Sequence, residues 1–228
     1  MKRDIHAVSV KEGKFLFRLA RDTTIGGCIV EVGSWKGYST IQLAKGAKAG
    51  PDKIIYAIDP HTGSDVHHQM YGEVSTLDEF NNNTIEAGVR DIINPMVMTS
   101  KEAEVAWKAD ALPIALLFID GDHEDTEDDF LRWEPYVVSG GVIAIHDTTT
   151  WPSKVPYRTA VKYLYKSKWF WPVRRVGSIT YAVKTNRYNA LQQRLNLTWL
   201  VFRSLWQATG IPCLNKTKYY VGRILGKV

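Results

Sequence analysis

Residues 29–40 read IVEVGSWKGYST, an apolar run that leads into a glycine-containing turn and then into a helical pattern. Glu31 lies near the end of the run, and Gly33 and Gly37 stand on either side of the bulky Trp35. Glycine is needed where a backbone turns sharply or approaches a ligand closely. Dinucleotide-binding enzymes favour G-x-G-x-x-G, whereas the spacing here is E-x-G-x-x-x-G. The segment therefore predicts a strand, a ligand-binding turn and a helix of an α/β domain.

Short β-branched segments alternate with longer helical patterns on both sides of this turn, over residues 27–184. Near-continuous apolar strands indicate a parallel sheet covered on both faces. We predict a Rossmann-like, doubly wound α/β fold with a mostly parallel seven-stranded sheet and a C-terminal antiparallel hairpin that turns at Gly177-Ser178. Thr76 and Glu79 match a capping box at the start of a helix. The predicted strands are 28–32, 53–58, 95–98, 112–119, 141–145, 169–176 and 179–184, and the predicted helices are 38–45, 76–88, 101–107, 124–136, 154–166 and 188–209.

Charge divides the chain unevenly. Residues 1–150 carry 14 Lys/Arg and 24 Asp/Glu, whereas residues 151–228 carry 15 Lys/Arg, no acidic residue and five of the eight tryptophans. We predict a domain over residues 1–186 and a basic, aromatic, helical C-terminal extension over residues 187–228. No apolar run of about 18 residues is present, and two distant cysteines make no disulfide framework. The expected location is the cytoplasm. Peripheral attachment to the inner face of the membrane is the alternative.

Three loops should meet at the carboxyl ends of the parallel strands, where ligands of doubly wound sheets bind. In the first, Glu31 can accept hydrogen bonds from an ammonium group, and Ser34 with the following amides can hold a carboxylate. In the second, Asp59 can bind two ribose hydroxyls. In the third, Ser100 and Lys101 are placed to flank a nucleobase.

Four segments in order, IVEVGSWKGYST, YAIDPHTG, LLFIDGDH and SGGVIAIHDTT, together resemble class I S-adenosylmethionine-dependent methyltransferases. The last two resemble metal-dependent O-methyltransferases, among them macrocin O-methyltransferases, cephalosporin hydroxylase-like proteins and, most closely, a mycobacterial methylmannose-polysaccharide O-methyltransferase. The resemblance spans residues 27–184 and implies that Gly33, Asp59 and the Ser100 region contact the cofactor. The predicted S-adenosylmethionine contacts are Glu31, Gly33, Ser34, Tyr38, Ser39, Asp59, His61, Ser100, Lys101 and Asp120.

Asp120 and Asp147 follow two predicted strands that should be neighbours, which would place two carboxylates in one crevice. A hard divalent cation requires such oxygen ligands. The resemblance has one departure here, because catechol-type enzymes end this strand in Asp-Asn and macrocin-type enzymes in Asp-Asp, whereas this chain has His146-Asp147. His146 could ligate the metal, act as a base or favour a softer ion. We predict a metal site of Asp120, His146 and Asp147, with Mg²⁺ as the favoured ion.

A hydroxyl acceptor must lose its proton, and imidazole has a pKa that suits a general base. His123 is the first choice for this base, because it stands in register with the catalytic lysine of the catechol-type enzymes. His146 is the second choice. His61 is placed nearest the site within the loop after residue 58, and His67, His68 and Tyr71 of that loop receive no role.

The predicted function is metal-assisted O-methylation of a sugar hydroxyl on a glycan, polysaccharide or lipid-linked saccharide. The alternatives are a small-molecule (natural-product or phenolic) O-methyltransferase and a non-catalytic membrane- or glycan-binding module. No NPPY-type motif follows the fourth predicted strand, so we expect no nucleic-acid acceptor. The last helix carries an apolar stripe of Leu191, Leu195, Trp199, Phe202 and Trp206. This stripe could rest on a membrane, form a homodimer interface or pack back onto the domain. Packing onto the domain is the commonest outcome for such a stripe.

Overall fold

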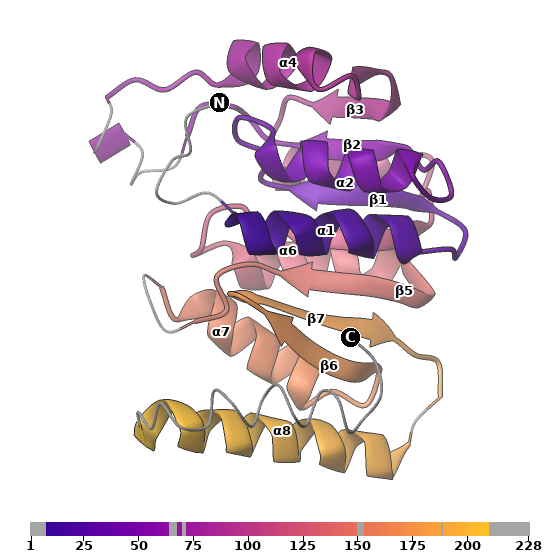
Figure 1. Ribbon diagram of the computed structural model, residues 1–228, viewed down its shortest axis with the longest axis vertical. Coiled ribbons are helices and arrows are strands. Elements are labelled where there is room, and N and C mark those ends of the chain that lie inside the picture. The colour runs from indigo at the N-terminus through magenta and orange to yellow at the C-terminus, as the bar shows by residue number, and fades with distance from the viewer. Residues whose placement is uncertain (1–7, 64–67, 70–71, 150–152, 188, 210–228) are drawn as a thin grey trace.

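The computed structural model describes residues 8–63, 68–69, 72–149, 153–187 and 189–209 of the 228-residue chain, with side chains described as far as residue 202. Seven strands form one sheet in the order β3-β2-β1-β4-β5-β7-β6 (Figure 1). The first five are parallel, and β7 pairs antiparallel with both β5 and β6. The predicted fold class is therefore confirmed. The strands are β1 Cys28–Val32, β2 Ile55–Ile58, β3 Ile93–Met96, β4 Ile114–Ile119, β5 Val137–Ile145, β6 Phe170–Val176 and β7 Ile179–Lys184.

Helices cover both faces of the sheet, and every residue of β1 and β4 is therefore buried. Side chains alternate across a strand, so Ile29 joins a core with α1, α2 and α4, whereas Val30 joins a second core with α5, α6 and η3. Among the described residues no helix is both long and apolar enough to cross a membrane. The helices are α1 Val10–Asp22, α2 Tyr38–Lys48, α4 Leu77–Glu86, η1 Arg90–Ile92, α5 Ser100–Trp107, α6 Thr126–Trp133, η2 Glu134–Tyr136, α7 Val155–Thr159, η3 Ala160–Tyr165 and α8 Ala190–Thr209.

One local prediction is wrong, and one helix was missed. Thr76 makes no capping bond to α4, because its hydroxyl contacts His61 Nδ1 at 2.9 Å instead. Helix α1 was not predicted, although Ser9 and Glu12 form a reciprocal capping box at its start. This helix packs against α2 on the front of the sheet in Figure 1 and brings Glu12 towards the end of β5.

The last helix, α8, packs through Asn196 rather than through its apolar stripe. The Asn196 side chain accepts a hydrogen bond from the Val173 amide at 3.2 Å and donates one to the Phe170 carbonyl at 2.8 Å, which fixes α8 beside β6. Leu191, Leu195 and Trp199 lie on the exposed side of the helix, so the expectation that the stripe packs back onto the domain is wrong for them. The Trp206 side chain and residues 210–228 lie outside the described part, and the boundary at residue 187 stays a prediction.

Candidate active site

The turn after β1 lies directly against the end of β4. Gly33 has φ +86°, and a Cβ atom there would lie 2.3 Å from the Asp120 carbonyl oxygen. The Asp120 amide in turn donates a hydrogen bond to the Val32 carbonyl at 2.8 Å. This close approach at the switch point between β1 and β4 sets the ligand-binding turn beside the first predicted metal ligand.

Two buried oxygens, one at the end of β1 and one in the turn that follows, lack hydrogen-bond partners in the described structure. Glu31 is fully buried; its Oε2 accepts a hydrogen bond from Thr40, and its Oε1 has no partner. Burial raises the pKa of the Glu31 carboxyl to about 8, although Ser39 and Thr40 oppose the rise. Ser34 is 1 % exposed, and its Oγ also lacks a partner. Buried polar atoms are normally satisfied, so such orphaned atoms indicate a place for a polar ligand.

Asp59 ties the turn after β1 to the loop after β2. Its two carboxylate oxygens each accept a backbone hydrogen bond at 2.7 Å, from Trp35 and from His61. Trp35 and His61 both have positive φ values, 47° and 59°. His61 is buried against Phe80, and its Nε2 is a third orphaned polar atom. Strained non-glycine residues of this kind persist where the surrounding structure holds them in place, often at binding sites.

The remaining predicted cofactor residues are oriented differently. Ser39 is buried and lowers the pKa of Glu31, and the Tyr38 ring lies against Gly13 of α1. Ser100 Oγ accepts a hydrogen bond from the Trp133 indole at 2.8 Å, which turns it towards α6, and Lys101 is exposed on α5. Cofactor contact by these four residues stays a prediction.

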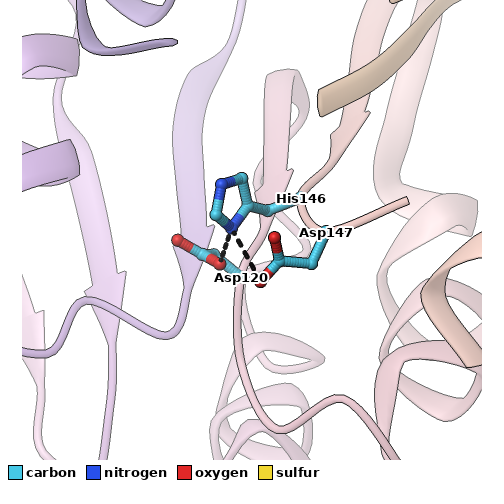
Figure 2. Close-up of side chains that lie close together, drawn as sticks. All are labelled: Asp120, His146 and Asp147. Carbon is cyan, nitrogen blue, oxygen red and sulfur yellow. Dashed lines mark ion pairs between the residues drawn. The ribbon is translucent and has the colours of Figure 1, made fainter. Parts of the chain in front are cut away.

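Asp120, His146 and Asp147 converge at the carboxyl ends of β4 and β5 (Figure 2). His146 Nδ1 lies 2.7 Å from Asp120 Oδ1 and 3.4 Å from Asp147 Oδ2. One ligand atom from each residue lies within 4.8 Å of the others. Adjacent parallel strands produce this arrangement, because Ile119 of β4 pairs in register with Ile145 of β5.

These three side chains fit a divalent cation. His146 is 5 % exposed, and despite its approach to Asp120 its Nδ1 makes no aligned hydrogen bond. Burial would lower the His146 pKa, but Asp120, Glu12 and Asp147 outweigh it and raise that pKa well above its ordinary value. Carboxylates that surround a single imidazole leave excess negative charge in a poorly solvated place. A cation bound by the two aspartates and His146 would neutralise that charge.

His123 completes the group from the loop after β4. Its Nε2 lies 3.0 Å from Asp147 Oδ2, and its side chain is 32 % exposed. The hydrogen bond to Asp147 raises the His123 pKa above its ordinary value, and burial partly opposes the rise. Asp122, the other acid of this loop, accepts a hydrogen bond from the Glu124 amide at 3.0 Å and so caps a local turn.

Glu12 of α1 is a site residue that the sequence patterns did not predict. It is 5 % exposed, and its Oε2 lies 3.8 Å from His146 Nε2. Its Oε1 accepts hydrogen bonds from the Ser178 amide at 2.6 Å and the Ser178 hydroxyl at 2.9 Å. In the sequence, the capping pair Ser9 and Glu12 was the available signal for the start of α1. Glu12 joins α1, the β6–β7 turn and the end of β5 behind the candidate metal ligands.

The substitution Glu12→Gln is expected to lower the free energy of unfolding by about 1–3 kcal/mol. The amide NH₂ group of glutamine would face hydrogen-bond donors whose bonds the carboxylate now accepts. Burial raises the Glu12 pKa, but the ion pair with His146 and the hydrogen bonds from Ser9 and Ser178 outweigh it and hold that pKa well below its ordinary value. A depressed pKa adds stability above the unfolded-state value, about 4.3, and that stability is lost on further acidification. The difference between wild type and variant should therefore shrink as pH falls below about 4.3.

Urea denaturation from pH 7 to pH 3 measures this effect. Glu79→Gln is the matched control, because Glu79 forms an ion pair with Lys36 while 56 % exposed, and exposed pairs contribute little. Equal losses in the two variants at pH 7 would contradict the role assigned to Glu12.

Comparison with known proteins agrees with this geometry. A family model described as a methyltransferase domain matches residues 30–148. An O-methyltransferase from Bacillus cereus, solved with SAH, has 21 % identity and a TM-score of 0.61, over 79 % of this chain and 84 % of its own. TomG from Streptomyces achromogenes, solved with SAM and involved in tomaymycin synthesis, has 20 % identity and a TM-score of 0.60, over 81 % and 92 %. The O-methyltransferase NovP has 20 % identity and a TM-score of 0.63, over 80 % and 84 %. At such identities the solved structures establish the shared fold.

Proposed function

The chain belongs to the methyltransferase domain family, and from this membership we propose that it transfers a methyl group from S-adenosylmethionine to a hydroxyl oxygen with the help of a divalent cation. The observation that carries the proposal is the convergence of Asp120, His146 and Asp147, with His123 bonded to Asp147, beside the glycine turn. We propose Mg²⁺ as the first ion to test and a sugar hydroxyl of a glycan, polysaccharide or lipid-linked saccharide as the acceptor.

The orphaned atoms of the glycine turn match the amino-acid part of S-adenosylmethionine. Glu31 Oε1 can accept a hydrogen bond from the ammonium group, which would also restore the charge that burial suppresses. Ser34 Oγ can donate to the carboxylate. Asp59 keeps acceptor capacity beyond its two backbone bonds, because each carboxylate oxygen has two lone pairs, so it can also bind ribose hydroxyls.

Methyl transfer is a displacement in which the acceptor oxygen forms a bond to the methyl carbon while the carbon–sulfur bond breaks and its electron pair stays on sulfur. A divalent cation, when bound, polarises the acceptor hydroxyl and lowers its pKa. The chain must still remove the hydroxyl proton. His123 Nε2–H donates to Asp147, which leaves Nδ1 with the lone pair that takes this proton.

We assign the base to His123 rather than His146 because of their surroundings. His123 is 32 % exposed and has one carboxylate partner, so an acceptor can reach it. His146 is 5 % exposed and lies within 4 Å of three carboxylates, which suits a ligand held in one orientation. A sugar hydroxyl is far less acidic than a phenol, so both the cation and a base would be required.

A second candidate acceptor is a small natural product, because one solved structure with this fold, TomG, is described as acting in tomaymycin synthesis. The chemistry would be the same, and only the acceptor would differ. A panel of methylmannosides, oligosaccharides and catechols, incubated with methyl-labelled S-adenosylmethionine, distinguishes the two by which acceptor receives the label.

Metal removal tests the proposal directly. Treatment with EDTA is expected to reduce methyl transfer at least about 100-fold, because the acceptor would lose its polarising cation. Addition of Mg²⁺, or of the softer Mn²⁺, should restore the rate, and isothermal titration of the chelated protein should show one cation bound. Full activity in EDTA would contradict metal assistance while leaving methyl transfer itself intact.

A further inference from the structure

The outer face of α8 exposes large apolar side chains in a continuous stripe. Leu191 is 65 % exposed, Leu195 40 % and Trp199 46 %, and Val201 and Phe202 are 58 % and 48 % exposed beside them. Leu191, Leu195 and Trp199 are spaced four residues apart, so they share one side of the helix. Asn196 holds the opposite side against β6. In Figure 1, α8 is the outermost element at the end of the molecule farthest from β3 and α4.

Basic residues accompany this stripe. Arg194 is exposed on α8, and exposed Lys166 lies beside it, because Gln193 Nε2 donates to the Lys166 carbonyl at 3.0 Å. Trp169, in the same turn as Lys166, is 50 % exposed. No acidic residue occurs between residues 151 and 228. Positive charge with exposed leucine and tryptophan is typical of helices that lie at an anionic lipid surface.

We propose that the α8 surface, formed by Leu191, Leu195, Trp199, Val201 and Phe202, docks the protein onto an anionic membrane. The stripe would enter the headgroup region, where the tryptophan ring is favoured, and Arg194 and Lys166 would meet lipid phosphates. This inference goes beyond methyl transfer, since the α8 surface belongs to none of the loops that form the candidate site.

Charge argues for lipid over the other occupants. In a symmetric dimer through α8, the α8 surface of one chain would pack against the same surface of the other. Arg194 would then lie near positive charge, and α8 has no acidic residue to pair with it. Nucleic acid would use the basic groups but would gain little from leucine side chains.

The test is co-sedimentation with vesicles of phosphatidylcholine alone or with about 30 % phosphatidylglycerol. We expect the full chain to bind the anionic vesicles at least about tenfold more tightly, with affinity falling as salt rises. The double variant Leu195→Glu/Trp199→Glu should lose about tenfold or more of this affinity. Val105→Glu is the matched control, because Val105 is 64 % exposed on α5, away from α8, and it should bind as the wild type does.

Both variants should keep S-adenosylmethionine affinity, which reports correct folding independently of lipid. The proposal is overturned if the wild type does not bind anionic vesicles, or if the double variant binds them equally well. It is also overturned if light scattering shows a dimer that the double variant converts to a monomer, because the stripe would then be a subunit interface. If the wild type binds duplex DNA and the double variant loses that DNA affinity to the same extent, the surface would be assigned to nucleic acid instead.

Discussion

Replacement of Asp147 by alanine is expected to lower kcat at least about 1,000-fold at saturating S-adenosylmethionine, because the change removes two functions together. Asp147 supplies one of the three candidate metal ligands, and it accepts the hydrogen bond that orients His123. The backbone of Asp147 has φ 48°, and aspartate already carries the Cβ strain of that conformation, so alanine adds little strain. The loss of thermal stability in this variant should therefore be small compared with its loss of kcat.

Asp122→Ala is the control for this substitution. Asp122 lies two residues from Asp120, but it caps a turn through the Glu124 amide rather than facing the candidate metal ligands. We expect its kcat to stay within about threefold of wild type, since substitutions away from the reacting groups cost little. Steady-state methyl transfer and cation titration should be measured for both variants. An Asp147→Ala enzyme that keeps full activity and cation affinity would remove this group from the mechanism.

The pH profile supplies a second readout of the same pair. Asp147 raises the pKa of His123 because it stabilises the imidazolium. In the metal-free protein, a pH titration of the His123 ring followed by NMR should therefore give a pKa above about 6.5. Without Asp147 that pKa should be lower, because the carboxylate partner of the imidazolium is lost.

The fold was predictable because its signals are local. Strands β2 and β4 are unbroken apolar runs, and β4 is buried at every position. Helix α1 carries a mixed charge pattern with its core residues Phe15 and Leu16 inside it, and no apolar run marks it. Strand β3 begins at Ile93, two residues before its predicted start, because the pairing of Ile93 with Ile55 depends on the neighbouring strand.

The candidate site was predictable where topology alone places a residue. Asp120 and Asp147 follow strands that are adjacent and parallel, so their proximity follows from the strand order. Glu12 reaches His146 from 134 positions earlier in the sequence, and that contact depends on how α1 packs across the sheet. Rotamer and packing decide such contacts, and sequence periodicity carries no information about them.

Gly33→Ala is expected to abolish detectable S-adenosylmethionine binding and to lower the free energy of unfolding by about 2–5 kcal/mol. The new Cβ would lie 2.3 Å from the Asp120 carbonyl oxygen and 2.6 Å from the Gly121 Cα, both of them backbone atoms that cannot rotate away. The turn after β1 must then separate from the end of β4. That displacement moves Glu31 and Ser34 away from Asp120, so cofactor binding and the candidate metal site should fail together.

Gly88→Ala separates this clash from ordinary glycine strain. Gly88 has φ +68°, and a Cβ atom there would meet nothing within 4 Å, so alanine at this position should cost only about 1 kcal/mol. Thermal unfolding with and without S-adenosylmethionine distinguishes the variants, because a ligand that binds the native state raises Tm. Wild type and Gly88→Ala should show the ligand-dependent rise, and Gly33→Ala should unfold at a lower Tm that ligand does not change. A normal ligand-dependent rise in Gly33→Ala would show that the close approach of β1 and β4 is not needed for binding, and the cofactor would then have to be placed elsewhere on the sheet edge.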